Sequence, residues 1–182
     1  VYVADVKVGQ NATVYVNVSA VDANSKAIPQ GTVTVAVGGV SYTINLHDAD
    51  GYATGSTQIR ALEARDHIVY AMYNSGPNYL PSENNTFTFN VAKNESAINV
   101  IVDNVQVGQR AVVYVNVTAA DPNSKAIPQG NVTITVVGDK QYTINLHDAD
   151  GYATGSVTLD ELLANDYRVY ATYDSDSNYN PS

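Results

Sequence analysis

The chain contains 182 residues, of which 45% are hydrophobic and only 15% are charged, and its formal net charge is −9. This acidic balance argues against binding to nucleic acids and to anionic membrane surfaces, which attract basic proteins. No stretch approaches the roughly 18 apolar residues of a membrane span, and the lack of cysteine excludes disulfides, thiolate metal sites and thiol nucleophiles.

The first half of the chain predicts seven short β-strands. Apolar residues alternate with polar ones, as in a strand with one face in a core and one in water. In chain order, the expected strands lie around 3–8, 14–18, 33–37, 42–46, 52–58, 69–73 and 87–91. The one helical candidate, 59–65, is too short to be stable alone, and we expect a crossing between two sheets there. Seven short strands in about 90 residues are typical of an immunoglobulin-like sandwich.

The second half of the chain repeats the first. Two strings occur twice without change: NSKAIPQG at Asn24–Gly31 and Asn123–Gly130, and YTINLHDADGYATGS at Tyr42–Ser56 and Tyr142–Ser156. Such self-similarity indicates tandem copies of one structural unit. We therefore predict an all-β chain of two tandem immunoglobulin-like β-sandwich domains, 1–94 and 95–182. The short polar join near 92–97 favours a rod over a flexible tether.

The second copy has no counterpart of the last expected strand. Ser182 aligns with Ser82, and the first copy continues through the strand at 87–91. In one hypothesis the chain is a segment of a longer periodic array that supplies this strand. In the alternative, the chain is a fibre subunit whose second domain receives the strand from another chain, because an unpaired edge and an apolar groove accept such an addition. We expect the first.

The repeated string His-Asp-Ala-Asp-Gly allows two interpretations. Two carboxylates two residues apart before a glycine resemble the start of a calcium loop, which would make Asp48, Asp50, Asp148 and Asp150 weak calcium ligands. Calcium needs about six to eight oxygen ligands, however, and no acidic residue occupies the next odd position. We therefore expect Asp50-Gly51 to form a hairpin turn between two strands, and we expect no cofactor other than this alternative calcium.

The polar residues do not form a recognisable catalytic motif. The histidines are His47, His67 and His147, and none accompanies a G-x-S-x-G nucleophile motif. A glycine-rich phosphate loop with its lysine is also missing. The carboxylates that one would pair for glycoside hydrolysis lie on a small turn. We expect no enzymatic activity and assign no catalytic residue.

Tyrosine is frequent, with 14 copies in the chain. Most of these side chains are expected to pack in the sheets or the core, because tyrosine pairs well across strands. Tyr79 and Tyr179 lie in corresponding Asn-Tyr-x-Pro-Ser loops. There they close the end of the core or, alternatively, bind a surface glycan or a protein partner through the ring and hydroxyl.

Acceptor sequences for N-glycosylation are dense in the chain. The Asn-x-Ser/Thr pattern occurs at Asn11, Asn17, Asn84, Asn94, Asn116 and Asn131. Strands rich in valine and threonine produce single triplets by chance, but the whole set favours a glycosylated extracellular protein.

The order of the motifs resembles a known family. Each copy starts with VGQ-x-A, at Val8 and Val107, and the second ends with ATY-x-x-D-x-NY-x-PS at Ala171–Ser182. This order is similar to the Ig-like repeats of archaeal adhesin-like surface proteins, notably of methanogens, and bacterial Ig-like stalk repeats share the D-x-D-G-x-A turn. The resemblance implies surface display, tandem arrays and no catalysis, and it transfers no binding residues.

Taken together, these features predict a non-catalytic module of an extracellular stalk or filament on a cell surface. Its partners would be neighbouring Ig-like repeats or identical subunits. A carbohydrate-binding or partner-binding module, using exposed tyrosines and the loops of Asp48 and Asp50, is a further alternative.

Overall fold

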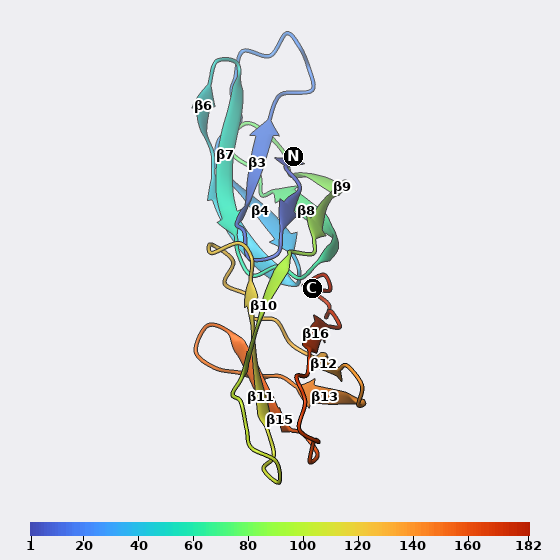
Figure 1. The fold of residues 1–182 in the computed structure, drawn as a ribbon. Helices are drawn as coiled ribbons and strands as arrows, with labels where there is room; N and C mark the ends of the chain where they lie inside the picture. Colours follow the sequence, from blue (N-terminus) through green and yellow to red (C-terminus); the bar gives the residue numbers. More distant parts are fainter. The chain divides into compact units, whose positions relative to one another are not determined.

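The computed structural model describes residues 1–182 and is all-β, as predicted. The chain divides into two compact units, Val1–Ala92 (unit 1) and Lys93–Ser182 (unit 2). The expected division between 94 and 95 lies close to this one. Within each unit the strands form two layers (Figure 1). No helical segment that would be able to cross a membrane is present.

Unit 1 contains strands β1 to β9 in two sheets. One sheet has the strand order β1-β3-β7-β6, and the other has the order β2-β9-β8-β4-β5. The bounds in chain order are β1 (Tyr2–Val3), β2 (Val6–Lys7), β3 (Ala12–Val18), β4 (Thr32–Val37), β5 (Val40–Asn45), β6 (His47–Ala49), β7 (Tyr52–Ile59), β8 (Arg65–Tyr73) and β9 (Ser82–Ala92).

The alternation of side chains decides which face of each sheet is buried. In β3, Val14 and Val16 are buried, and in β4, Val33 and Val35 are buried on the facing sheet. The inward faces of both sheets thus share one core, which is the arrangement of a β-sandwich. The polar residues between these positions remain half-buried or exposed, so the period of two read from the sequence is confirmed here.

The expected first strand at 3–8 is divided into two strands. β1 pairs with β3 in one sheet, whereas β2 pairs in parallel with β9 in the other. The chain therefore changes sheets between them, and the Oδ1 atom of Asp5 accepts a hydrogen bond from the backbone N–H of Asn90 at 2.7 Å. The buried residues Val3 and Val8 are an odd number of residues apart, so the period of two is interrupted at this crossing. The segment 60–64 is a non-helical crossing between β7 and β8, as expected.

Unit 2 contains strands β10 to β16, again in two sheets. The sheet orders are β10-β11-β15-β14 and β13-β12-β16. The bounds are β10 (Ser96–Val102), β11 (Val112–Ala119), β12 (Asn131–Val136), β13 (Gln141–Asn145), β14 (His147–Asp148), β15 (Ala153–Thr158) and β16 (Val169–Tyr173). Residues of both sheets, among them Val115 and Ile134, form a single buried cluster.

Unit 2 differs from unit 1 at one side of the sandwich. It has no counterpart of β9, so one edge of β16 is without a neighbouring strand. It also has no counterpart of β2, because 103–107 form no strand. In addition, β16 begins only at Val169, whereas β8 begins at Arg65. All three differences lie where β9 would pair.

Candidate functional site

The repeated carboxylates lie at a hairpin turn. Asp50 and Gly51 connect β6 and β7 as a two-residue loop, and both have positive φ angles, 30° and 96°. Positive φ at both central residues defines a type I′ turn, in which Asp-Gly is a favoured pair. In unit 2, Asp150 has a φ of 46°, and the N–H of Ala149 donates to the Tyr152 carbonyl at 2.8 Å. The expected turn is confirmed in both units.

The geometry adds no further ligands to these carboxylates. No group of three or more histidine, cysteine, aspartate or glutamate side chains in the chain is placed to hold a metal ion. Asp48 and Asp148 are exposed. A calcium ion at either turn would therefore lack the additional protein oxygens that it normally takes, and the calcium interpretation gains no support from the structure.

Tyr179 closes the end of the core of unit 2, which is the first of its two expected roles, and the alternative binding role gains no support. Its side chain is fully buried, and its hydroxyl donates to the Ala126 carbonyl at 2.5 Å and lies 2.8 Å from the Ser124 Oγ atom. Burial raises the pKa of this hydroxyl. The Oδ1 atom of Asp176 accepts the backbone N–H of Tyr179 at 2.7 Å, which fixes the loop. A ring held in this way is not accessible to a ligand.

Tyr79 occupies the same place in unit 1. Its hydroxyl donates to the Ala27 carbonyl at 2.6 Å and lies 2.7 Å from the Ser25 Oγ atom. The side chain is half-buried. Because the hydroxyl is already engaged with the loop of the repeated NSKAIPQG string, the polar group expected to bind a ligand is used to hold the fold.

A second tyrosine anchors the same loop in each unit. The Tyr173 hydroxyl donates to the Gln129 carbonyl at 2.8 Å, and the Tyr73 hydroxyl donates to the Gln30 carbonyl at 2.6 Å. Burial, followed by the negative charge of Asp176, raises the pKa of Tyr173 far above its usual range. Four tyrosines thus close the cores of the two units.

The glycosylation acceptors differ in accessibility. Asn11, Asn17, Asn84 and Asn131 are exposed, and Asn116 is half-buried. Asn94 is only 2% exposed, and its Oδ1 atom accepts the Glu95 N–H at 2.9 Å. The folded unit has no room for a glycan on the Asn94 side chain. Asn94 is therefore removed from the glycosylation sites predicted from the sequence.

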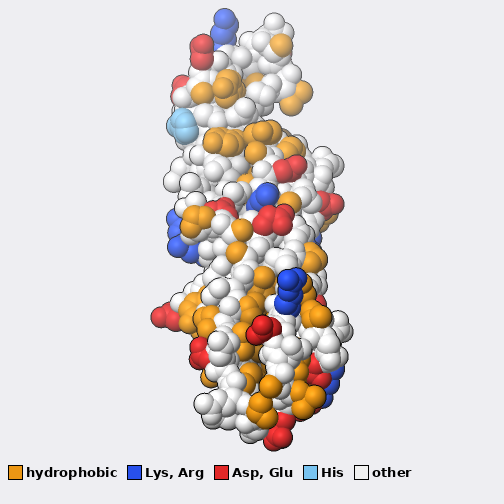
Figure 2. Space-filling view, in the orientation of Figure 1, with side chains coloured by type: hydrophobic (Ala, Val, Ile, Leu, Met, Phe, Trp, Pro, Cys, Tyr) orange, Lys and Arg blue, Asp and Glu red, His pale blue; other side chains and the backbone are white.

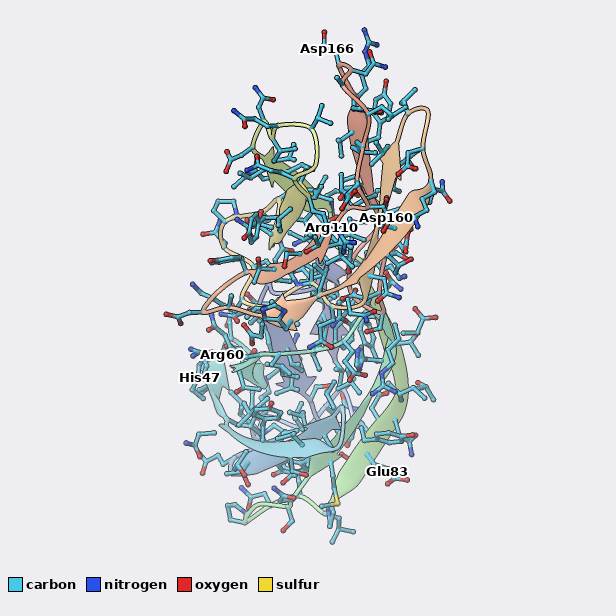
Figure 3. The ribbon with its side chains drawn as sticks, turned by 60° about the horizontal axis from the view of Figure 1, so that its bottom comes forward. His47, Arg60, Glu83, Arg110, Asp160 and Asp166 are labelled. Carbon is cyan, nitrogen blue, oxygen red and sulfur yellow. The ribbon has the colours of Figure 1, made fainter.

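The most strongly coupled charged pair lies at the surface. Lys140 and Asp160 form an ion pair, and Asp160 is close to Arg110 (Figure 3). The hydrogen bond and charge of Asp160 raise the pKa of Lys140, and those of Lys140 lower the pKa of Asp160. Exposed pairs of this kind contribute little stability.

A groove lies in unit 2, on the side where β9 lies in unit 1, and its lining is both polar and apolar. It has a volume of about 550 Å³. Its walls include Val105, Val107 and Val169, together with Leu159, Leu162 and Leu163 from 159–163. Hydrophobic side chains are visible at the surface of this unit (Figure 2). We refer to this feature as the open side of unit 2.

Comparison with unit 1 shows what opens this side. Val8 is 1% exposed in unit 1, but the corresponding Val107 is 69% exposed. Val69 is fully buried, but the corresponding Val169 is half-buried. The same residue types are therefore solvated in unit 2 because no strand covers them.

Searches of known protein families, of curated proteins and of solved structures found no match to the chain. The assignment of a function therefore rests on the residues and geometry described above.

Sequence reasoning located the missing strand but not the groove residues. The lack of a counterpart to β9 was visible in the aligned copies. The exposure of Val107 and Leu163 could not be predicted, because apolar residues at these positions are equally typical of a core or of a crossing between sheets. These residues could have been found by aligning unit 2 with the residues of unit 1 that β9 covers.

Proposed function

We propose that the chain is a non-catalytic structural module of an extracellular stalk or filament, built from tandem immunoglobulin-like domains. The observation that carries the proposal is that the residues repeated in the sequence have the same structural roles in both units. In unit 1 the repeated strings supply the Asp50-Gly51 turn and the Gln30 carbonyl that accepts the Tyr73 hydroxyl. Their copies do the same in unit 2. Repetition that preserves a fold, without a cluster of reactive groups, is what modular arrays require.

The polar interior supports a structural role. Every buried side-chain nitrogen and oxygen atom has a hydrogen-bond partner. In active sites and ligand sites, some buried polar atoms commonly lack a hydrogen-bond partner until the substrate or ligand binds. The buried hydroxyls of Tyr173 and Tyr179 are instead satisfied by backbone carbonyls. The proposal therefore includes the lack of enzymatic activity.

The surface supports an extracellular glycoprotein. Exposed acceptors such as Asn11 and Asn131 are distributed over both units, and a net charge of −9 would keep many copies in an array apart and soluble. The motif order that resembles archaeal adhesin-like repeats points the same way. The partners proposed are neighbouring repeats of the same type.

Two alternatives have different support. A carbohydrate-binding role loses its main candidate, because Tyr179 is buried and Tyr79 is held by its loop. Assembly of fibre subunits would require a strand donated by another chain, and residues 1–182 offer no spare one, because each strand from β1 to β16 is paired within its own unit.

Protease treatment of intact cells that produce the protein tests the proposed function. Mass spectrometry of the released peptides should recover sequences from both units, with glycan masses on accessible acceptors such as Asn11 and Asn131 and none on Asn94. Recovery of the peptides only after cell lysis, with every acceptor unmodified, would contradict the extracellular assignment.

A further inference from the structure

The outward face of one strand in each unit carries a tyrosine two residues before a glycosylation acceptor. In unit 1, β3 contains Tyr15 and Asn17, separated by the buried Val16. In unit 2, β11 contains Tyr114 and Asn116 in the same arrangement. Successive side chains of a strand point to opposite faces, so residues two apart share a face and lie about 7 Å apart. Each tyrosine is thus a direct neighbour of an acceptor on one face of the sheet.

Both tyrosine rings are accessible to a group attached at the acceptor. Tyr15 and Tyr114 are each 50% exposed, although strands pair with β3 and with β11 on both sides. The ring centroid of Tyr15 lies 6.4 Å from that of Tyr2, its partner on β1, and Ile101 of β10 takes this position beside Tyr114. Cross-strand pairs of this kind are favourable, so each ring has a defined place on the sheet while half of its surface stays open.

A threonine of the neighbouring strand holds the acceptor amide in the same way in both units. The Thr54 hydroxyl of β7 donates to the Asn17 Oδ1 atom at 2.7 Å. The Thr154 hydroxyl of β15 donates to the Asn116 Oδ1 atom, also at 2.7 Å. β7 lies beside β3 in Figure 1, on the side away from β1. These hydrogen bonds engage the oxygen atom of each amide and leave available the Nδ2 atom, to which an N-linked sugar is attached.

The other accessible acceptors lack this arrangement. The residues two positions before Asn11, Asn84 and Asn131 are glycine, serine and glutamine. The last residue of the acceptor pattern changes from serine after Asn17 to threonine after Asn116, but the tyrosine and the asparagine are the same in both units. The combination of an exposed ring, a shared face and a held amide therefore distinguishes these two acceptors.

We propose that Asn17 and Asn116 carry glycans whose first sugar packs against the ring of the neighbouring tyrosine, Tyr15 or Tyr114. The C–H groups on one side of a sugar ring are apolar and fit the negative face of an aromatic ring, while the tyrosine hydroxyl stays in water. The attached sugar thus covers apolar ring surface that the polypeptide leaves exposed. The glycan stabilises the folded unit through this contact, and the inference rests on the glycoprotein part of the proposed function.

The test uses the full chain with a single N-acetylglucosamine placed on Asn17. A synthetic segment 1–19 that carries the sugar is ligated to residues 20–182 through a temporary cysteine, which desulfurisation converts to the native Ala20. The step is selective because the chain has no cysteine of its own. Proton spectra of the folded chain should show sugar C–H signals shifted upfield by the ring current of Tyr15.

The Tyr15→Thr variant separates the contact from other effects of the sugar, and threonine keeps the preference for a strand. The upfield shifts should be lost in this variant. Urea unfolding of unit 1, with and without the sugar, completes the cycle. The sugar should raise the equilibrium constant for folding by a factor of about two to ten more in the parent chain than in the variant, which is the range for a pairwise aromatic contact.

A sugar on Asn11 is the matched control, because the same synthetic segment carries it and it lies roughly 13 Å from Tyr15 along an extended chain. Its signals should not shift, and its effect on stability should not depend on Tyr15. Tyr52 is a second tyrosine near the site, two residues before Thr54 on β7. The Tyr52→Thr variant should leave the signals of the sugar on Asn17 shifted.

Three results would overturn the proposal. The first is sugar signals on Asn17 at the same positions as in the urea-unfolded chain, and the second is an equal effect of the sugar with and without Tyr15. The third is loss of the shifts in the Tyr52→Thr variant alone, which would assign the contact to another ring. Because the sugar is installed chemically, none of these results depends on where the protein resides. Failure here is therefore distinguishable from failure of the proposed function, which the peptides released from intact cells decide.

Discussion

At the scale of single residues, the sheets depend on two glycines where the backbone of one layer approaches the other. A Cβ atom added at Gly55 would lie 2.5 Å from the Ile44 Cγ2 atom and 2.7 Å from the Asn45 carbonyl oxygen. The corresponding Gly155 meets Ile144 and Asn145 in the same way. The glycine in the repeated string is thus required by packing, which a sequence pattern of period two does not indicate.

We expect Gly155→Ala to destabilise unit 2 by about 1–3 kcal/mol, the usual cost of forcing an extra group into a packed core. Urea unfolding followed by the amide signals of each unit measures this change. Gly55→Ala should reproduce the loss in unit 1 and serves as the matched variant. Unchanged unfolding midpoints in both variants would show that the layers have room that the structure does not reveal.

The buried tyrosines predict a loss of stability at alkaline pH. Because the folded-state pKa of Tyr173 is raised above its ordinary value of 10.0, its contribution to stability is complete below about pH 10. Above that pH the unfolded chain releases the proton first, so stability falls as pH rises toward the folded-state pKa. Tyr179 is shifted in the same direction.

Urea unfolding of unit 2 between about pH 8 and pH 11 measures this dependence. The Tyr173→Phe variant should be less stable near pH 8, because the hydrogen bond to Gln129 is lost, but it should lose less stability at alkaline pH. An alkaline slope identical in the variant and the parent protein would contradict the assigned cause.

At the scale of elements, the repeated His-Asp-Ala-Asp-Gly segment is a turn and not a metal loop. We expect millimolar calcium to leave the melting temperature unchanged, since no further protein ligands surround Asp48 and Asp50. Calorimetry with calcium and with magnesium as the control measures this. A calcium-specific rise in melting temperature that is abolished by Asp50→Asn, which tolerates the positive φ of the turn, would restore the calcium interpretation.

Strand β9 completes unit 1 chiefly through its inward side chains. Phe89→Ala should destabilise unit 1 by about 3–5 kcal/mol, the usual cost of truncating a buried phenylalanine. Phe87 is only half-buried, so Phe87→Ala should cost less and provides the control. Thermal unfolding followed by signals from unit 1 measures both. Equal losses from the two variants would contradict the different burial of the two rings.

The all-β fold and most elements were predictable because each strand keeps a clear period of two. The type I′ turn at Asp50-Gly51 was predictable because this dipeptide favours it. The division of the first strand into β1 and β2 was not, because the shift in phase between the buried Val3 and Val8 also occurs within a single strand that contains a bulge. The buried state of Asn94 was not predictable either, because it depends on contacts far along the chain, such as the backbone hydrogen bonds of Asn94 with Asn178 and Asn180, which local patterns do not encode.

At the scale of the whole molecule, the two units share one two-sheet design, and within residues 1–182 only unit 1 contains a strand equivalent to β9. Unit 1 buries Val8 and Val69 beneath β9, whereas unit 2 leaves Val107 and Val169 accessible. The central claim is therefore that unit 2 has an open edge at β16.

Amide hydrogen exchange of the purified chain tests this claim most directly. The amides of Val69 and Ala71 lie between paired strands in unit 1, and those of Val169 and Ala171 lie at the open edge of unit 2. The account predicts slow exchange for the first pair and exchange faster by at least about tenfold for the second, since paired core strands open with nearly the full free energy of unfolding. Equally slow exchange in both pairs would mean that unit 2 is already complete, and it would contradict the account.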